Sequence, residues 1–336
     1  MGSSNTTERL FYIDFLKFIG LTGIFVAHVG APNWAIMLRS FDVPLMVFLS
    51  SVLAQRSYDR YISSGLTAKD YCFSRIQRLV YPTWFFLVLY FLLCFIMDKQ
   101  AYGIKYYVDS FLLTRYGIGY VWIVLIYLYS AVLVPLFSNK SPSGSDAIVI
   151  CLVYVLYELA YHYQIGIRYK VIETTFYYII PYGIITYLGY HYSGFSSRTK
   201  YSVTILSGVT FIVLIVYYLL ETGTFQSVSA YKHPPRLYYL SYGIASVFLL
   251  MLLCERYRFR IFRNRIILFI SSHSMWIYLW HILVLKLYEK SHLPKTWYIK
   301  LVIVYAVSVF QVMLVNKCLD YLEKRHHYTF LRYLRG

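Results

Sequence analysis

The stretch RLFYIDFLKFIGLTGIFVAH, residues 9–28, has the length and apolar content of a membrane-spanning helix. It nevertheless carries a carboxylate at Asp14, an ammonium at Lys17 and an imidazole at His28. A central Asp or Lys costs about 2.5–3.5 kcal/mol on insertion scales, so ionisable groups in spans usually serve a cavity or a pathway. At about 100° per residue the three side chains share one helix face. The alternative interpretation is that the three ionisable groups have no functional role and only pair with residues of neighbouring helices. We favour a functional site, because packing alone poorly explains three such groups on one face.

The composition is that of a protein that crosses the membrane many times. The chain has 336 residues, of which 59% are hydrophobic, 20% aromatic and only 14% charged, and its mean hydropathy is +0.54. Soluble domains carry about 25% charged residues. The net charge of +17 comes mostly from Lys and Arg in short loops between apolar runs. This pattern favours anionic lipid headgroups or an anionic cofactor as partners, and it does not indicate nucleic acid.

Apolar runs of about 20 residues predict an all-α, polytopic helix bundle that forms a single domain over residues 1–336. The expected spans are near residues 10–29, 38–56, 79–97, 117–137, 146–162, 174–192, 201–220, 237–255, 266–287 and 298–318. The nine histidines show no HxxxH or HExxH spacing, so we expect no metal site.

The distribution of Lys and Arg among the loops predicts the orientation. Most of them lie on the side that carries both termini, so the positive-inside rule places both termini in the cytoplasm, for a protein of the plasma (inner) membrane. Asp14 and Lys17 then lie in the cytoplasmic half of the first span. His28 and the later His281 lie in the outer half.

Four blocks of sequence, read in order, resemble the acyltransferase-3 family of integral membrane acyltransferases. The blocks are IDFLK with a following AH, VPLMVFLSS, RIQRLVYP and ISSHSMWIYLWH, within residues 13–28, 43–51, 75–82 and 270–281. The chain differs from the family pattern at Lys17, where arginine is usual, and at Ser51, where glycine is usual. The resemblance spans nearly the whole chain.

This resemblance implies an O-acyltransferase, most simply an O-acetyltransferase that uses acetyl-CoA. The implied acceptor is a hydroxyl of a cell-envelope polysaccharide or of a lipid-linked sugar. Acyl transfer to a hydroxyl needs a base, and an imidazole suits that role. We therefore expect His28 to act as the base, with Lys17 and Asp14 as its companions in the catalytic helix. Lys17 could hold an anionic group of the substrate, or it could pair with Asp14 to keep the helix neutral.

Arg75 and Arg78 are the expected binding residues for the acyl donor. They lie three residues apart, so they share a helix face at the cytoplasmic entrance. Two guanidinium groups on one face suit the phosphates of acyl-CoA. The alternative is that they only anchor the third span by the positive-inside rule.

Ser274, Tyr278 and His281 share a face of the ninth expected span, where their polar groups could bind sugar hydroxyls. Trp122 could stack on a sugar or sit at the membrane interface. The alternative for all four residues is an interfacial aromatic belt.

Two other functions remain open at this point. The first is a glycan exporter or flippase without acyltransferase activity, although the sequence lacks evident inverted repeats. The second is a scaffold of an envelope-polysaccharide assembly that would not bind coenzyme A. The favoured partners are acyl-CoA, a glycan acceptor and membrane lipids.

Overall fold

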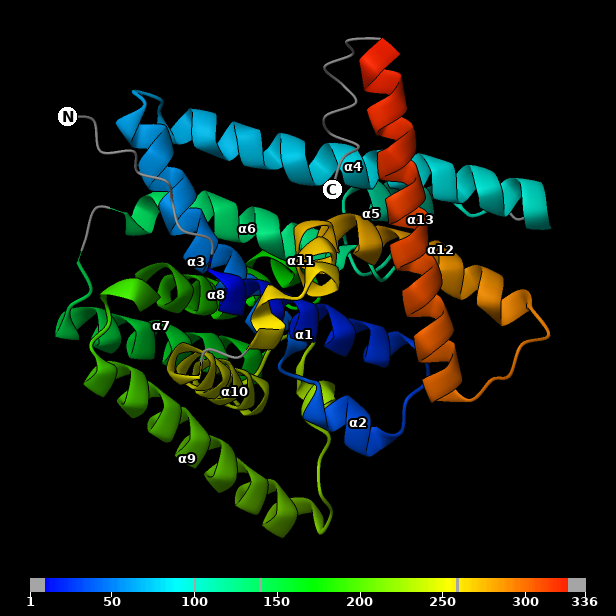
Figure 1. Ribbon diagram of the computed structural model, residues 1–336. Coiled ribbons are helices and arrows are strands. Elements are labelled where there is room, and N and C mark those ends of the chain that lie inside the picture. The colour runs from blue at the N-terminus through cyan, green and yellow to red at the C-terminus, as the bar shows by residue number, and fades with distance from the viewer. Residues whose placement is uncertain (1–9, 100, 139–140, 258–259, 326–336) are drawn as a thin grey trace, which may run out of the picture.

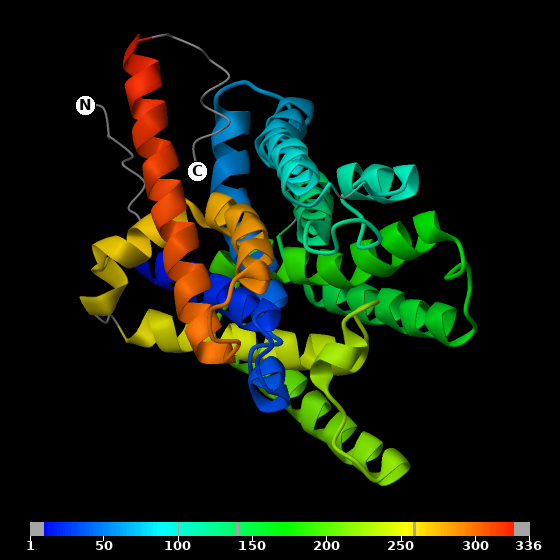
Figure 2. The ribbon, with the colours of Figure 1, turned by 90° about the vertical axis from the view of Figure 1, so that its right-hand side faces the viewer.

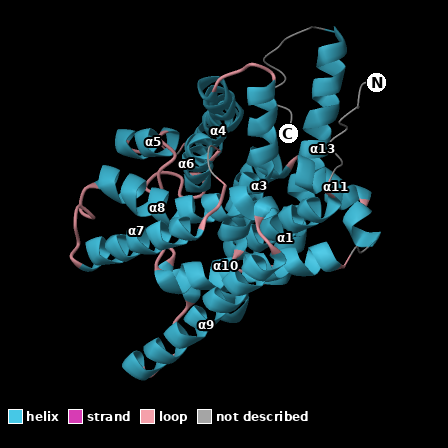
Figure 3. Cartoon of the chain, turned by 90° about the vertical axis from the view of Figure 1, so that its left-hand side faces the viewer, coloured by secondary structure: helices cyan, strands magenta, loops and turns pink. Residues whose placement is uncertain are grey.

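The computed structural model describes residues 10–99, 101–138, 141–257 and 260–325. All regular elements in these residues are helices, which confirms the predicted all-α class (Figure 3). The α-helices are α1 (Phe11–His28), α2 (Asn33–Leu38), α3 (Asp42–Ser63), α4 (Ala68–Asp98), α5 (Ile104–Phe111), α6 (Trp122–Phe137), α7 (Gly144–His162), α8 (Lys170–His191), α9 (Ser197–Thr222), α10 (Leu237–Arg256), α11 (Arg265–Ser272), α12 (Ser274–Lys290) and α13 (Trp297–Arg325). Short 3-10 turns lie at η1 (Tyr192–Gly194), η2 (Val228–Tyr231) and η3 (Arg260–Arg263).

Most of the long helices are suited to cross a membrane. Within the described residues, seven segments are long and apolar enough on their own, and the bent pair of α11 and α12 makes an eighth. The shorter α6 and the polar-flanked α8 complete a bundle close to the ten predicted spans. The protein is therefore an integral membrane protein.

The helices differ sharply in how much of their surface the protein covers. In Figure 1, α1 lies in the middle of the bundle and α9 lies at its edge. Leu16 and Phe25 of α1 have no exposed surface. By contrast, α9 has no buried residue and packs against α10, and its Leu220 is 81% exposed. Such an apolar, uncovered helix is suited to contact lipid. Helix α13 also lies on the outside of the bundle, against α12 (Figure 2).

Helix α4 begins earlier than predicted. The expected span started near residue 79, but the helix starts at Ala68. The Thr67 hydroxyl accepts from the Asp70 amide at 3.3 Å, and the Asp70 carboxylate accepts from the Thr67 amide at 2.8 Å. This capping box starts the helix within a polar stretch that hydropathy does not assign to a span. With 31 residues, α4 is about 46 Å long, which exceeds a hydrocarbon core of about 30 Å.

The expected single helix over residues 266–287 is wrong. The chain forms α11 and α12 instead, bent by 81° at His273. Partners from α1 stabilise the break: Lys17 Nζ donates to the Ser271 carbonyl at 2.9 Å, and Ser271 Oγ donates to Asp14 at 2.6 Å. Backbone interrupted at membrane depth is tolerated where protein groups satisfy it.

Candidate active site

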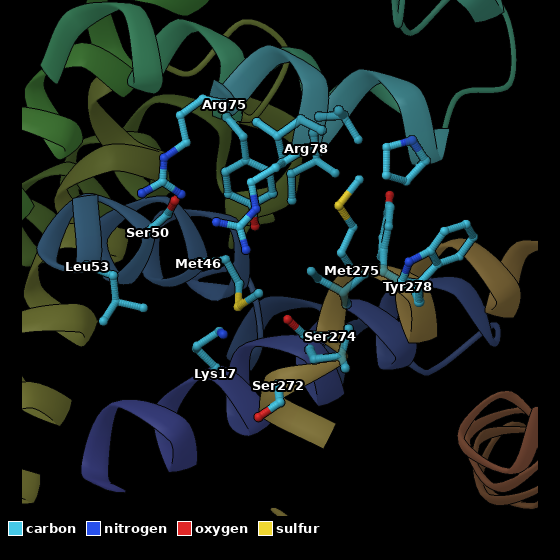
Figure 4. Close-up of a pocket in the computed structure, with 18 of the residues that line it drawn as sticks. Lys17, Met46, Ser50, Leu53, Arg75, Arg78, Ser272, Ser274, Met275 and Tyr278 are labelled. Atoms are coloured by element: carbon cyan, nitrogen blue, oxygen red, sulfur yellow. The ribbon is translucent and has the colours of Figure 1, made fainter. Parts of the chain in front are cut away.

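A cavity of about 720 Å³ opens between α1, α3, α4, α6 and the α11–α12 break (Figure 4). This volume lies within the range of about 300–1,000 Å³ that is typical of small-molecule sites. One end is cationic and polar, with Lys17, Arg75, Arg78, Ser272 and Ser274. The other end is apolar and aromatic, and it includes Ile24, Val124, Tyr127 and Tyr278. The cavity therefore suits a ligand with an anionic end and a long, less polar arm.

The two arginines project from α4 into the cationic end (Figure 4). Arg75 is half-buried, and its guanidinium lies 5.2 Å from the centre of the Tyr71 ring. Arg78 is exposed. Neither arginine forms an ion pair with a carboxylate in the described part of the chain. Both guanidinium groups can therefore hydrogen-bond to an anionic ligand.

Lys17 lines the same end of the cavity and holds the last turn of α11. A cation near a helix C-terminus is favourable, because it faces the negative end of the helix dipole. Beyond the bend, α12 starts at Ser274, which also lines the cavity. The first amide groups of a helix favour anions. The break thus places the start of α12 at the cavity that the three cationic side chains line.

His28 and His281 form a pair near the end of α1. The nitrogen atoms His28 Nδ1 and His281 Nε2 are 2.9 Å apart, and the rings stack with centres 5.1 Å apart. His281 Nδ1 also contacts the Tyr278 carbonyl oxygen, which can only accept, so Nδ1 carries the proton. With both rings neutral, His281 Nε2 is then a hydrogen-bond acceptor and His28 Nδ1 must donate to it. These hydrogen bonds assign the tautomer of His28, and they leave its Nε2 as the ring nitrogen with the lone pair.

Two tyrosine side chains lie between the cavity and the histidine pair. Ile24 lines the cavity, and His28 lies one turn further along α1, about 6 Å away along the axis. Tyr278 lines the cavity too, and its hydroxyl donates to the Tyr120 carbonyl. The Tyr120 ring in turn packs edge-on against His28, with 4.6 Å between the ring centres. Tyr278 and Tyr120 therefore form the wall between the cavity and His28.

The structure brings most of the predicted site residues to two neighbouring places. Five of them line the cavity: Lys17, Arg75, Arg78, Ser274 and Tyr278. His28 and His281 lie together behind the tyrosine wall, with His281 fully buried. Asp14 lies behind Lys17, where it accepts from Ser271, and Trp122 lies outside the cavity. Ser274 and Tyr278 thus share a cavity with the arginines and not with His281.

Sequence reasoning missed a second cluster at the His28 end, which we call the loop cluster: Lys232 and His233 at the Trp122 ring, with the charge of Arg39 nearby. The Lys232 ammonium lies 5.2 Å from the centre of the Trp122 ring, and the His233 ring centre lies 4.7 Å from that ring. His233 Nδ1 is 2.9 Å from the Tyr178 hydroxyl. The only sequence signal was Lys232-His233 beside two prolines in a loop, which normally indicates solvated residues.

The pKa values of both basic residues at the Trp122 ring are lowered. Enclosure by the protein, together with the nearby Arg39, lowers the pKa of Lys232 to about 8, although Asp42 acts in the opposite direction. Partial burial of the ring lowers the pKa of His233, and the charges of Lys232, Arg115 and Arg39 add to this effect. At neutral pH, Lys232 is therefore mostly charged and His233 is neutral.

The described residues contain no group of three or more His, Cys, Asp or Glu side chains placed to hold a metal ion. The histidine pair therefore has no third ligand of these types in that part of the chain.

Comparison with known proteins identifies the family of the chain. The model described as an acyltransferase domain, of the acyltransferase-3 family, matches residues 10–316, which include all helices of the bundle core. No curated protein and no solved structure shows a significant match. Because the match covers nearly the whole chain, the protein belongs to the acyltransferase-3 family and is a membrane acyltransferase.

Proposed function

We propose that the protein transfers an acyl group, most simply acetyl, from acyl-CoA to a hydroxyl of a cell-envelope polysaccharide or lipid-linked sugar. One observation carries this proposal. A cavity begins at two arginines and ends at a tyrosine wall one helical turn from a histidine whose Nε2 has the lone pair. This arrangement provides a binding site for an anionic donor and a base for the attacking hydroxyl.

The donor fits the cavity by its chemistry. Coenzyme A carries phosphate groups at one end and a thioester at the end of a long, flexible arm. Its phosphates would bind Arg75 and Arg78, with Lys17 and the first amides of α12 close by. The arm would extend along Ile24 and Val124 toward Tyr278. In this proposal Ser274 and Tyr278 contact the donor.

The histidine pair supports the transfer step. His28 Nε2 would take the proton of the sugar hydroxyl as its oxygen attacks the thioester carbonyl. The new bond joins this oxygen to the acyl carbon, and the bond that breaks joins the acyl carbon to sulfur. The proton then passes from His28 to the departing thiolate of coenzyme A. A positioned base contributes about 10²–10⁴-fold to such a reaction.

The loop charges support an orientation for this chemistry. The positive-inside rule puts the Arg75 end in the cytoplasm, where acyl-CoA is made, and the His28 end toward the outer face. Residues 175–179 and the His273-Ser274 pair resemble the O-acetyltransferase of enterobacterial common antigen, which supports a glycan as the acceptor. Donor and acceptor would then meet at the tyrosine wall from opposite sides of the membrane.

Acetyl-CoA binding to the purified protein in lipid vesicles tests the donor assignment. We expect the double variant Arg75→Ala/Arg78→Ala to weaken binding at least about tenfold, since hydrogen bonds to charged groups are worth about 1.5–3 kcal/mol each. Lys69→Ala is the matched control, because Lys69 is an exposed cation on the same helix and does not line the cavity. Unchanged binding by the double variant would contradict the assignment. Glycan movement that needs no acetyl-CoA would favour an exporter instead.

A further inference from the structure

The charges at the His28 end do not balance. Asp42 is fully engaged: its Oδ2 lies 2.6 Å from Arg39, and its Oδ1 accepts from the Val43 amide at 2.7 Å. Arg115 pairs with Glu173 at 2.7 Å. In the described part of the chain, the Lys232 side chain forms no ion pair and no hydrogen bond, and its ammonium lies 5.2 Å from the centre of the Trp122 ring. Lys232 is therefore the surplus cation of the loop cluster.

This cation is enclosed and yet accessible. Lys232 and Trp122 are half-buried, and His233 is exposed. Burial is the main reason that the pKa values of Lys232 and His233 are lowered, and the positive charge of Arg39 lowers both further, while Asp42 opposes the shift of Lys232. Placing a cation there without a carboxylate is unfavourable for the protein alone. An incoming anion would remove this penalty, because opposite charges stabilise each other most where water is partly excluded.

The loop cluster lies next to the histidine pair. Tyr120, whose ring packs against His28, is two residues before Trp122 in the chain. A molecule held at Trp122 and Lys232 would therefore lie close to the segment that packs against His28.

We propose that Lys232, Trp122 and His233 form a subsite for an anionic glycan, a sugar that carries a carboxylate or a phosphate. Lys232 binds the anionic group, and the Trp122 ring stacks on the sugar. His233 uses Nδ1 toward Tyr178, so its Nε2 faces the ligand as a hydrogen-bonding group. This inference rests on the proposed function, because it names the class of acceptor whose hydroxyl would reach His28.

Binding of small probes to the full-length protein tests the subsite without any acyl transfer. The protein is reconstituted in phosphatidylcholine vesicles, which supply no anionic lipid, and acetyl-CoA is omitted. The probes are glucose, glucuronic acid and glucose 1-phosphate, whose dissociation constants are measured by equilibrium dialysis. We expect at least one anionic probe to bind about tenfold or more tightly than glucose, as one charge-assisted contact allows. Glucuronic acid reports a carboxylate and glucose 1-phosphate reports a phosphate, so the stronger of the two identifies the anionic group.

Three variants make the result specific. Lys232→Gln should lower the affinity for the anionic probe to that for glucose, and Lys232→Arg should retain the preference. Lys105→Gln is the matched control, since Lys105 is an exposed cation of α5 outside the loop cluster, and it should bind as the original protein does. Equal binding of all three probes, or a preference that survives Lys232→Gln, would overturn the inference.

Acetyl-CoA binding separates this inference from the proposed function. Lys232→Gln should bind acetyl-CoA normally, because Lys232 does not line the donor cavity. If the original protein binds acetyl-CoA but shows no anionic preference, the subsite is refuted and the proposed function stands. If it fails to bind acetyl-CoA, the proposed function is refuted whatever the probes do.

Discussion

Replacing His281 tests whether its hydrogen bond controls the orientation of the base. In the structure His281 Nε2 is the acceptor for His28 Nδ1 at 2.9 Å, and His281 is fully buried. His281→Leu removes this acceptor and leaves the His28 N–H without a partner. Leaving a buried polar group unsatisfied costs about 1–3 kcal/mol, which corresponds to about 5–150-fold in rate if the cost falls on the catalytic orientation. His281→Gln keeps a carbonyl oxygen near the position of Nε2, so its loss should be smaller.

The assay is steady-state acetyl transfer from acetyl-CoA by the purified protein in vesicles, with kcat and KM measured separately. We expect kcat to fall in the order His281→Gln, then His281→Leu, while KM for acetyl-CoA stays unchanged, because His281 does not line the cavity. Thermal unfolding of both variants identifies losses that arise from misfolding. Equal activity of the two variants, or a kcat of His281→Leu within about twofold of the original, would refute the control of His28 by this hydrogen bond.

Three further predictions follow from other parts of the bundle. A Cβ at Gly189 would lie 2.6 Å from the Phe48 carbonyl oxygen, so Gly189→Ala should destabilise the protein by about 1–3 kcal/mol. An unchanged midpoint of thermal unfolding would contradict this close contact of α3 and α8. Binding of the anionic probe should weaken as the pH rises through about 8, because Lys232 loses its proton there. The affinity for glucose should not change with pH. An anionic probe that binds equally at pH 7 and pH 9 would argue against an ion pair with Lys232. Lys17→Met removes the donor to the Ser271 carbonyl and a cation from the cavity, so the affinity for acetyl-CoA should fall. The affinity of Lys17→Arg should be closer to that of the original protein. Normal acetyl-CoA binding by Lys17→Met would exclude a role for this cation.

The sequence was sufficient to predict the membrane bundle and the helix that carries the central histidine. Hydropathy finds spans because the apolar runs are long, and the ionisable face of α1 stands out within them. The break at His273 could not be found in this way. A hydropathy window averages over the short polar run from Ser271 to Ser274, and the groups of α1 that stabilise the break are about 255 positions away in the chain.

The sequence did not predict the loop cluster, for a different reason. Lys232 and His233 precede two prolines, and a basic pair in such a loop is usually solvated. Their contact with Trp122 joins segments that lie more than 100 residues apart. The same holds for the pairing of His28 with His281, since helix periodicity places residues on a face but does not say which face it meets.

The central claim is that His28 is the base of an acyl-CoA-dependent O-acyltransferase. It is tested most directly by transfer of label from radioactive acetyl-CoA to envelope glycan in membrane vesicles, with the original protein, His28→Gln and the control His292→Gln, an exposed loop histidine. We predict that the original protein and the control label the glycan. We also predict that His28→Gln is about 10²–10⁴-fold slower, although it inserts and binds acetyl-CoA normally. Labelling by His28→Gln at the original rate would contradict the claim.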